Sequence, residues 1–436
     1  MAQADGEMRM FWLALLLAID GDVPEHRDTA KFNDMDTQRF SIAGRVYDAD
    51  DPQLQDVLSR VHDTPERPRC LCVRGGVEMY VALHGKYRIK RMPGTGAQHR
   101  PDCPSFEMEG QLSGLGELLG EAILEPVSGQ IELRVDFALD RRPSSSIPHG
   151  ESEDVAEVGV PRRRMSLRAV MHYLFEKAQF NRWSPGMEGK RNQWVLQKYL
   201  LRASADVMVK GNPLSERLYV PEPFNESAKH DIARRRREKL SILRPRDGHY
   251  PMAIVMGEFK GSEPHTLGRR IWIKHMPDTP LLMPSKSWAR MERVFASVLE
   301  ARDADASYRP HVAMAALIRA RSEMTYEIEA ASLMLTTEQW IPIEGIHELG
   351  LIQALIDQRR KFIKPLRYDA KSSAGFASAL LLDAGDDPVQ LHVLSSFVSP
   401  KEREAKEKML KDIKGWVWDT GTDLPDLPAR RNAGSQ

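Results

Sequence analysis

Arg69-Cys-Leu-Cys72 and, after one intervening segment, His99-Arg-Pro-Asp-Cys103 contain all three cysteines of the sequence and a histidine among them. Two closely spaced thiolates followed by a second pair of ligands is the usual arrangement for one Zn²⁺ ion in a small module. The segment between the pairs, from Met79 to Arg91, has two β-rich arms and predicts a β-hairpin. We therefore expect a metal-stabilised hairpin in the N-terminal part of the chain.

The predicted metal ligands are Cys70, Cys72, His99 and Cys103. Three thiolates and one imidazole complete the tetrahedral coordination of zinc and leave no open position for water, so the predicted zinc site is structural. His84 is an alternative ligand, less favoured because it lies at the expected hairpin tip. Three ordinary buried cysteines are the competing interpretation, since free cysteine is common in protein cores. Their confinement to one short window favours zinc over that interpretation and over a disulfide.

Composition sets wide limits on the class of protein. The 436 residues are 42% hydrophobic and 28% charged, which suits two or three domains with substantial cores. Lys+Arg and Asp+Glu both number 62, so net charge indicates neither a nucleic-acid partner nor a membrane partner. The few cysteines predict a cytoplasmic location. The apolar segment 10–19 is too short to span a bilayer and is flanked by acids, so we expect no membrane partner.

Helical and β-type periodicities are mixed without a strict βαβ order, which predicts an α+β fold. We expect a small N-terminal zinc-bound hairpin module and a larger mixed α/β C-terminal domain. The predicted divisions are an N-terminal extension at 1–34, with Met35 as an alternative start, a zinc-hairpin domain at 35–140, a linker at 141–165, an α+β domain at 166–420 and a loose tail at 421–436. The expected elements include helices at 112–124 and 344–362 and strands at 130–139, 252–260, 269–276, 311–319 and 324–335.

Several strings resemble domain-of-unknown-function family 1173, whose members have three cysteines towards the N-terminus. They are Arg69-Cys-Leu-Cys72, Lys90-Arg-Met-Pro-Gly-Thr-Gly96, Gly257-Glu-Phe-Lys260, Trp340-Ile-Pro-Ile343 and Lys364-Pro-Leu-Arg-Tyr368. The resemblance extends over most of the chain from about Met35. It implies a bacterial protein of an integrative or conjugative mobile element, with other proteins of that element as partners and a DNA-related role. It implies no catalytic residues.

Nucleic-acid binding is the first functional hypothesis. The hairpin contains interleaved cations and tyrosines and no acid, so it could contact the phosphates of DNA or RNA and stack on bases. Its predicted contacts are Lys86, Arg88, Lys90 and Arg91. A second basic stretch adds Arg359, Arg360, Lys364 and Arg367, and a third lies at 234–239. The competing interpretation is that these cations only solvate outer faces of the fold.

A Mg²⁺-dependent nuclease of the PD-(D/E)XK type is the second hypothesis. Asp247 followed by Glu258-Phe-Lys260 fits the pattern of one acid and then E-x-K. In that pattern two carboxylates hold Mg²⁺ and the lysine orients water. Glu176 could add a third carboxylate, and Glu348 with Asp383 form a second acidic set that lacks the acid-x-Lys pair. Glu-x-Lys at a strand end is, however, more often a surface ion pair.

A non-catalytic adaptor of a transfer or defence system is the third hypothesis. Tryptophans would then anchor partner proteins, although side chains of this size are more often buried in the core. The candidate anchors are Trp194, Trp272, Trp288 and Trp416. The sequence has no phosphate-binding loop, HExxH, GxSxG or dinucleotide-binding glycine pattern, which excludes several common enzyme classes.

Overall fold

The computed structural model describes residues 38–84, 86–125, 130–141, 163–246, 248–303, 310–322, 324–371, 374–395, 399–411 and 415–431. The chain forms two compact units, one ending at Glu107 and the other beginning at Met108. Helices and mixed sheets occur together, which confirms the predicted α+β class. The predicted extension at 1–34 and the alternative start at Met35 lie outside the described residues.

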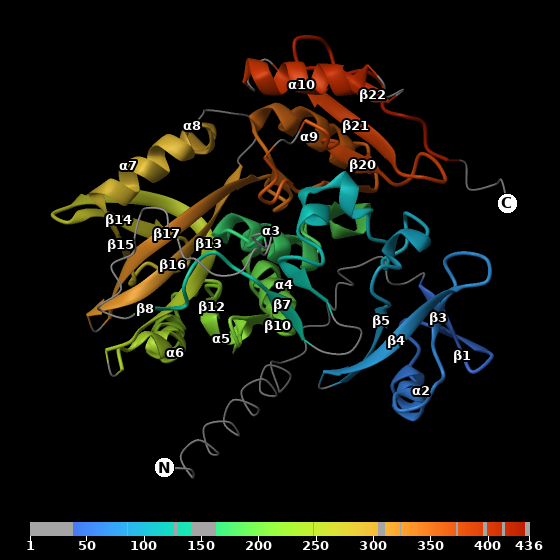
Figure 1. Ribbon diagram of the computed structural model, residues 1–436, viewed down its shortest axis with the longest axis horizontal. Coiled ribbons are helices and arrows are strands. Elements are labelled where there is room, and N and C mark those ends of the chain that lie inside the picture. Colours follow the sequence, from blue (N-terminus) through green and yellow to red (C-terminus); the bar gives the residue numbers. More distant parts are fainter. Residues whose placement is uncertain are drawn as a thin grey trace, which may run out of the picture. The chain divides into compact units, whose positions relative to one another are not determined.

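In the described residues of the first unit, a five-stranded sheet has one α-helix, α2 (Leu54–Val61), packed against it (Figure 1). The strands follow the order β2-β1-β3-β4-β5. Their bounds are β1 (Arg39–Ile42), β2 (Arg45–Asp48), β3 (Arg69–Cys70), β4 (Val77–His84) and β5 (Lys86–Arg91). β4 and β5 pair antiparallel along their length, which confirms the predicted hairpin.

The second unit begins with short elements where a helix was predicted over 112–124. Two 3₁₀ turns, η3 (Gly110–Leu112) and η4 (Gly114–Glu117), precede a short strand instead. Gly110 and Gly116 meet backbone to backbone, and a Cβ atom on Gly116 would collide with the carbonyl of Gly110. The prediction was wrong because the glycines allow a close chain contact that an α-helix would not make.

A four-stranded sheet, in the order β11-β10-β7-β6, joins this opening segment to the rest of the second unit. β7 pairs in parallel with β10, and the paired residues Ile131 and Val207 are 76 positions apart in the chain. The bounds are β6 (Ile123–Leu124), β7 (Ile131–Leu133), β10 (Val207–Val209) and β11 (Asn212–Pro213). The two compact units divide between Glu107 and Met108. The linker predicted at 141–165 stays a prediction, since its residues 142–162 lie outside the described part.

The centre of the second unit is a closed barrel of five strands. They are β13 (Tyr250–His265), β14 (Gly268–Ile273), β15 (Leu281–Pro284), β16 (His311–Ser322) and β17 (Thr325–Thr336). β13 pairs antiparallel with both β14 and β16, β14 with β15, and β16 with β17. β15 and β17 pair in parallel, and this pairing closes the ring.

The longest strand, β13, belongs to both walls of the barrel because it is bent. Its first half pairs with β16 and its second half with β14. The register shifts between Phe259 and Gly261, which marks a bulge at the bend. Val255, Phe259 and Ile271 fill the interior together with apolar side chains of β16 and β17. The apolar runs of the sequence thus become strands buried on their inner face.

Helices surround the barrel (Figure 1). α7 (Ser285–Val294) and α8 (Ala296–Asp303) connect β15 to β16 and contact β14, β15, β16 and β17, and α3 (Leu167–Lys177) contacts β16 and β17. The other elements up to the barrel are β8 (Asp140–Arg141), β9 (Arg182–Trp183), α4 (Gln193–Ser204), α5 (Leu214–Arg217), β12 (Leu218–Tyr219) and α6 (Lys229–Leu240).

A second five-stranded sheet, in the order β22-β21-β20-β19-β9, forms the C-terminal part of the unit. β18 (Pro342–Ile343) pairs with β17 of the barrel and precedes this sheet in the chain. The elements after it are α9 (Leu349–Asp357), β19 (Phe362–Ile363), β20 (Ala379–Leu381), β21 (Val389–Leu394), α10 (Pro400–Leu410) and β22 (Trp416–Asp419). The helix predicted over 344–362 is shorter because extended backbone at Gly345 precedes it and a positive φ at Arg359 follows it.

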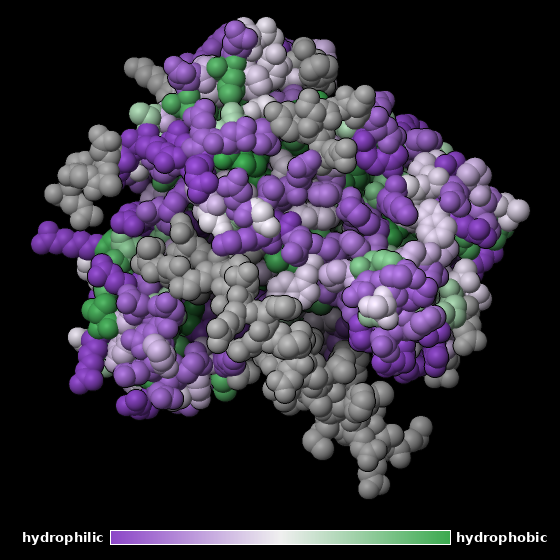
Figure 2. All heavy atoms as spheres, turned by 180° about the vertical axis from the view of Figure 1, so that it is seen from behind, coloured by the Kyte–Doolittle hydropathy of each residue, from purple (hydrophilic) through white to green (hydrophobic). Residues whose placement is uncertain are grey.

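The stretch after β22, predicted to be loose, makes specific contacts over its described residues. Trp416 Nε1 donates a hydrogen bond to the carbonyl of Asp426 at 2.9 Å, and Arg360 Nη1 donates to the carbonyl of Pro428 at 2.8 Å. Among the described helices, none combines the length and the apolar composition needed to cross a lipid bilayer. On the face shown in Figure 2, hydrophilic residues dominate and hydrophobic ones form small separate groups.

Candidate metal centre

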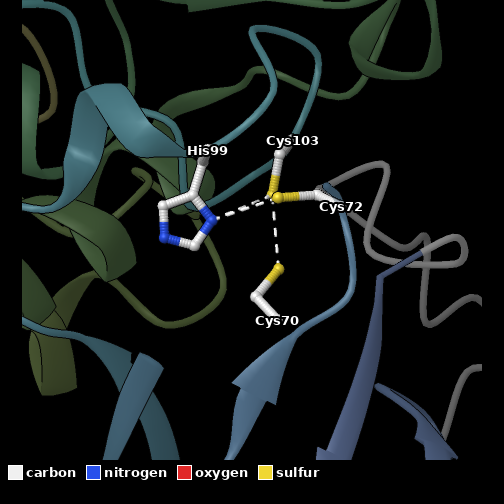
Figure 3. A group of neighbouring side chains, drawn as sticks. All are labelled: Cys70, Cys72, His99 and Cys103. Carbon is white, nitrogen blue, oxygen red and sulfur yellow. Dashed lines mark hydrogen bonds between the residues drawn. The ribbon is translucent and has the colours of Figure 1, made fainter. Parts of the chain in front are cut away.

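The four predicted ligands meet at one end of the first unit's sheet (Figure 3). Cys70 ends β3, Cys72 follows in the turn before β4, and His99 and Cys103 lie in the loop after β5. Their ligand atoms all lie within 4.8 Å of one another. No other group of three or more such side chains is found in the ranges that the structure describes. This cluster could hold a metal ion.

The distances between the ligand atoms match the edges of a coordination tetrahedron. Cys70 Sγ lies 3.7 Å from Cys103 Sγ, and His99 Nδ1 lies 3.3 Å from Cys72 Sγ and 3.8 Å from Cys103 Sγ. With Zn–S bonds of about 2.3 Å and Zn–N bonds of about 2.0 Å, a tetrahedron has S–S edges of about 3.8 Å and S–N edges of about 3.5 Å. These three spacings are close to those of a tetrahedral site, and the other pairs of ligand atoms lie within 4.8 Å.

Three of the four ligands are buried, and nearby N–H groups donate hydrogen bonds to two of the sulfurs. Cys70, His99 and Cys103 are all buried, and Cys72 is partly exposed. Gln38 Nε2 donates to Cys70 Sγ at 3.5 Å, and the backbone N–H of Ser105 donates to Cys103 Sγ at 3.4 Å. Such N–H···S contacts stabilise thiolates and orient them. Sequence spacing could not indicate Gln38, because an amide donor has no characteristic distance from the ligands it supports.

The electrostatics of the cluster agree with this geometry. Hydrogen bonds from the sulfurs of Cys103 and Cys72 lower the pKa of Cys70, and sharing the same proton raises the pKa of Cys103. Burial opposes a charge on His99, but its contacts with Cys70 and Cys72 raise the His99 pKa to about 9. The lowered pKa places negative charge on the Cys70 sulfur. A bound cation would neutralise that charge where it is most concentrated.

The family of the protein follows from a comparison with known family models. Residues 40–421 match the model of DUF1173, described as a protein of unknown function. The chain belongs to the DUF1173 family. The resemblance inferred from the cysteine pattern and the later strings is thereby confirmed, while the link to bacterial mobile elements stays a prediction. No curated protein and no solved structure matches this DUF1173 chain.

The structure of this DUF1173 protein describes two of the three residues of the predicted nuclease site, Glu258 and Lys260. Asp247 lies outside the described residues. Glu258 accepts a hydrogen bond from His311 Nδ1 at 3.0 Å and pairs with Lys274 Nζ at 3.0 Å. Burial raises the Glu258 pKa, but the contacts with His311 and Lys274 outweigh it and hold the pKa below its usual value. Lys260 is exposed next to the bulge of β13. Glu258 therefore serves an ion pair, and the geometry gives the nuclease hypothesis no support.

The other acids considered for catalysis also have structural partners. Tyr368 donates its hydroxyl to Glu176 Oε2 at 2.7 Å. Lys364 Nζ lies 3.3 Å from Glu348 Oε1, and both side chains are buried. Arg360 binds Asp383 with a shortest N–O distance of 2.8 Å. These acids are distributed over separate ion pairs and hydrogen bonds.

The predicted basic residues divide into exposed and buried ones. On the hairpin, Lys86, Arg88 and Lys90 lie on the face opposite the core, and Arg91 lies on the core face and pairs with Glu107. In the C-terminal stretch, Arg360 and Lys364 are buried in the ion pairs just described, so their charges are not available to a phosphate.

Several of the remaining predicted cations pair with acids of other segments. Arg359 is exposed and pairs with Glu188 at 2.9 Å, while Arg367 lies 3.7 Å from Glu402. In the 234–239 stretch, Arg236 is buried against Asp278.

Of the candidate anchors, Trp194 is 53% exposed and lies under the Lys198 ammonium, while Trp288 and Trp416 pack against the core. Trp272 is half-buried on β14.

Proposed function

We propose that this DUF1173 protein binds one structural Zn²⁺ ion through Cys70, Cys72, His99 and Cys103. The observation that supports the proposal is the tetrahedral spacing of three sulfurs and one imidazole nitrogen. Thiolates and imidazole are the ligands that zinc prefers, and four protein ligands leave no position for a substrate. The ion connects β3 to the loop after β5 and stabilises the first unit. Free thiolate ligands suit the reducing cytoplasm.

Elemental analysis tests the zinc proposal. Purified wild-type protein should contain about one zinc ion per chain, and Cys72→Ser should lose it. Ser59→Ala, an exposed change on α2 of the same unit, is the matched control and should keep the ion. Wild-type protein without zinc after purification free of chelators, or full zinc content in Cys72→Ser, would contradict the proposal.

We further propose that the zinc-stabilised hairpin binds nucleic acid. Lys86, Arg88 and Lys90 share the outer face of β5, because strand side chains alternate and Tyr87 and Ile89 pack into the core on the other side. Tyr80 is the cross-strand neighbour of Lys90 on the same outer face. Cations at this spacing suit successive phosphates, and a tyrosine beside them can stack on a base.

Binding at two salt concentrations tests the hairpin. A labelled oligonucleotide should bind the wild-type protein less tightly as salt rises, because phosphate contacts release counterions. Lys86→Glu with Arg88→Glu should weaken binding by on the order of tenfold at low salt. Arg45→Glu, an exposed change on β2 at the opposite edge of the sheet, should leave it nearly unchanged. Equal losses in both variants, or binding insensitive to salt, would exclude the hairpin as the site.

A further inference from the structure

The barrel of the second unit has a recognisable topology. Its strands follow the order β13-β14-β15-β17-β16 and close through β16 and β13, with one parallel pair, β15–β17. The helices α7 and α8 lie between the third and fourth strands, and the first strand is long, bulged and shared by both walls. This is the arrangement of the oligonucleotide/oligosaccharide-binding (OB) fold, a five-stranded Greek-key barrel. Since topology alone does not assign a function, the side chains on its outer face must decide.

We propose that the outer face of β13 and β14 binds single-stranded nucleic acid, with Trp272 as the stacking residue. Ile271 and Ile273 point into the barrel core, so the alternating residues Arg270 and Trp272 point outward. In barrels of this fold the second strand, here β14, forms part of the ligand-binding face. This site goes beyond the hairpin proposed above, because its residues belong to the second unit and do not depend on zinc.

The surface beside Trp272 is bare. Its cross-strand neighbour is Gly261, and a Cβ atom built on that glycine would have no heavy atom within 4 Å. Trp272 itself is half-buried, so part of its side chain is exposed. A partly exposed aromatic ring next to open backbone is a platform for a flat ligand, and every nucleobase offers such a face.

Cations surround this platform. Lys260, at the bulge of β13, and Arg270 are exposed and have no ion pair within the described residues. Lys274 is 47% exposed although it pairs with Glu258, and Glu258 is only 15% exposed. Glu263 is the exposed acid opposite Arg270. The exposed charge near Trp272 is therefore mainly positive, as a phosphate backbone requires.

The chemistry of the face selects single strands over the other ligands of this fold. Bases in a duplex are already stacked and paired, so only an unpaired base can lie on the indole. Oligosaccharides also stack on tryptophan but carry no phosphates for Lys260 and Arg270. The combination of an aromatic platform with exposed cations favours a single-stranded nucleic acid.

Fluorescence anisotropy with the full-length protein tests the proposal. The probe is a labelled oligothymidylate of about 16 nucleotides, the upper end of the site size of one such barrel. We expect binding to this strand to be tighter than to a duplex of equal length. Arg270→Glu and Trp272→Ala should each reduce affinity by on the order of tenfold. Lys408→Glu, an exposed change on α10 outside the barrel and outside the predicted basic stretches, is the matched control and should have little effect.

The experiment remains decisive if Trp272→Ala does not fold. Lys260→Glu with Arg270→Glu changes only exposed side chains, and its circular dichroism should equal that of wild type. Unchanged affinity in this double variant, equal loss in Lys408→Glu, preference for the duplex, or binding of oligosaccharides alone would each overturn the proposal. The hairpin variant Lys86→Glu with Arg88→Glu separates the two sites: if the barrel binds by itself, the oligothymidylate still binds and the remaining affinity still depends on Arg270.

Discussion

The two units of this protein have hydrophobic cores of very different size. The apolar core of the first unit is small, and Cys70 and Cys103 are themselves part of it together with Phe40, Ile42 and Leu58. The core of the second unit is far larger and extends from the barrel to the C-terminal sheet. Small domains bury little surface and often depend on a metal or a cross-link, whereas larger ones rely on burial. We therefore expect the proposed zinc ion to compensate for the small core of the first unit.

Metal removal should separate the two units most sharply. A chelator, or Cys103→Ala, should cause residues 69–107 to lose hydrogen-exchange protection, because zinc binding supplies about 10–16 kcal/mol of folding free energy in small zinc modules. Protection of the barrel strands should persist, since their core contains no metal ligand. Hydrogen exchange followed by mass spectrometry measures the protection of each unit separately. Unchanged protection of residues 69–107 in zinc-free protein would remove the distinction between the units.

The converse perturbation is to break the buried pair between Lys364 and Glu348, which lies in the second unit. Lys364→Met should lower the unfolding free energy of that unit by about 3–5 kcal/mol, because Glu348 is left buried without its partner. Replacing both residues, Lys364→Met with Glu348→Leu, should recover much of the loss. Urea unfolding measures the change, and zinc content should be unaffected. Loss of zinc in Lys364→Met would show that the two units are coupled.

Acid should weaken the second unit through a buried histidine. Burial and the nearby Arg168 hold the pKa of His172 at about 3, and its Nδ1 accepts the backbone N–H of Tyr368 at 3.0 Å. Because an unfolded histidine binds its proton near pH 6.5, stability falls as pH drops from about 6.5 towards 3, with a loss of about 3 kcal/mol by pH 4. His172→Asn keeps an acceptor and should flatten this dependence in urea unfolding. Identical pH profiles for variant and wild type would assign the acid sensitivity to other groups.

The smallest effect is expected on the hairpin surface. Arg88→Glu should change the stability of the first unit by less than about 0.5 kcal/mol, because the side chain lies on the face opposite the core. Thermal unfolding followed by far-ultraviolet circular dichroism is the measurement. A loss of more than about 1 kcal/mol would show that Arg88 has a structural role in addition to binding.

Features that depend on residues close together in the chain could be predicted from the sequence, whereas features that depend on contacts between distant segments could not. The metal cluster was predictable because a single hairpin brings its ligands together, and the barrel strands were predictable from their apolar runs. Closure of the barrel was not, since the pairing of Leu281 with Tyr326 has no local signal. Arg360 and Lys364 read as a surface basic stretch because their partners, Asp383 and Glu348, come from separate segments.

The pairing of β9 with β19 has a consequence for how the protein is made. Arg182 and Trp183 pair with Ile363 and Phe362, so the C-terminal sheet cannot form until the chain has passed that point. At a synthesis rate of about 5–20 residues per second, β9 emerges on the order of ten seconds or more before its partner. The first unit ends at Glu107, so all four proposed zinc ligands are synthesised long before β19. We expect nascent second units, with open strand edges during that interval, to depend on chaperones in a way that the first unit does not.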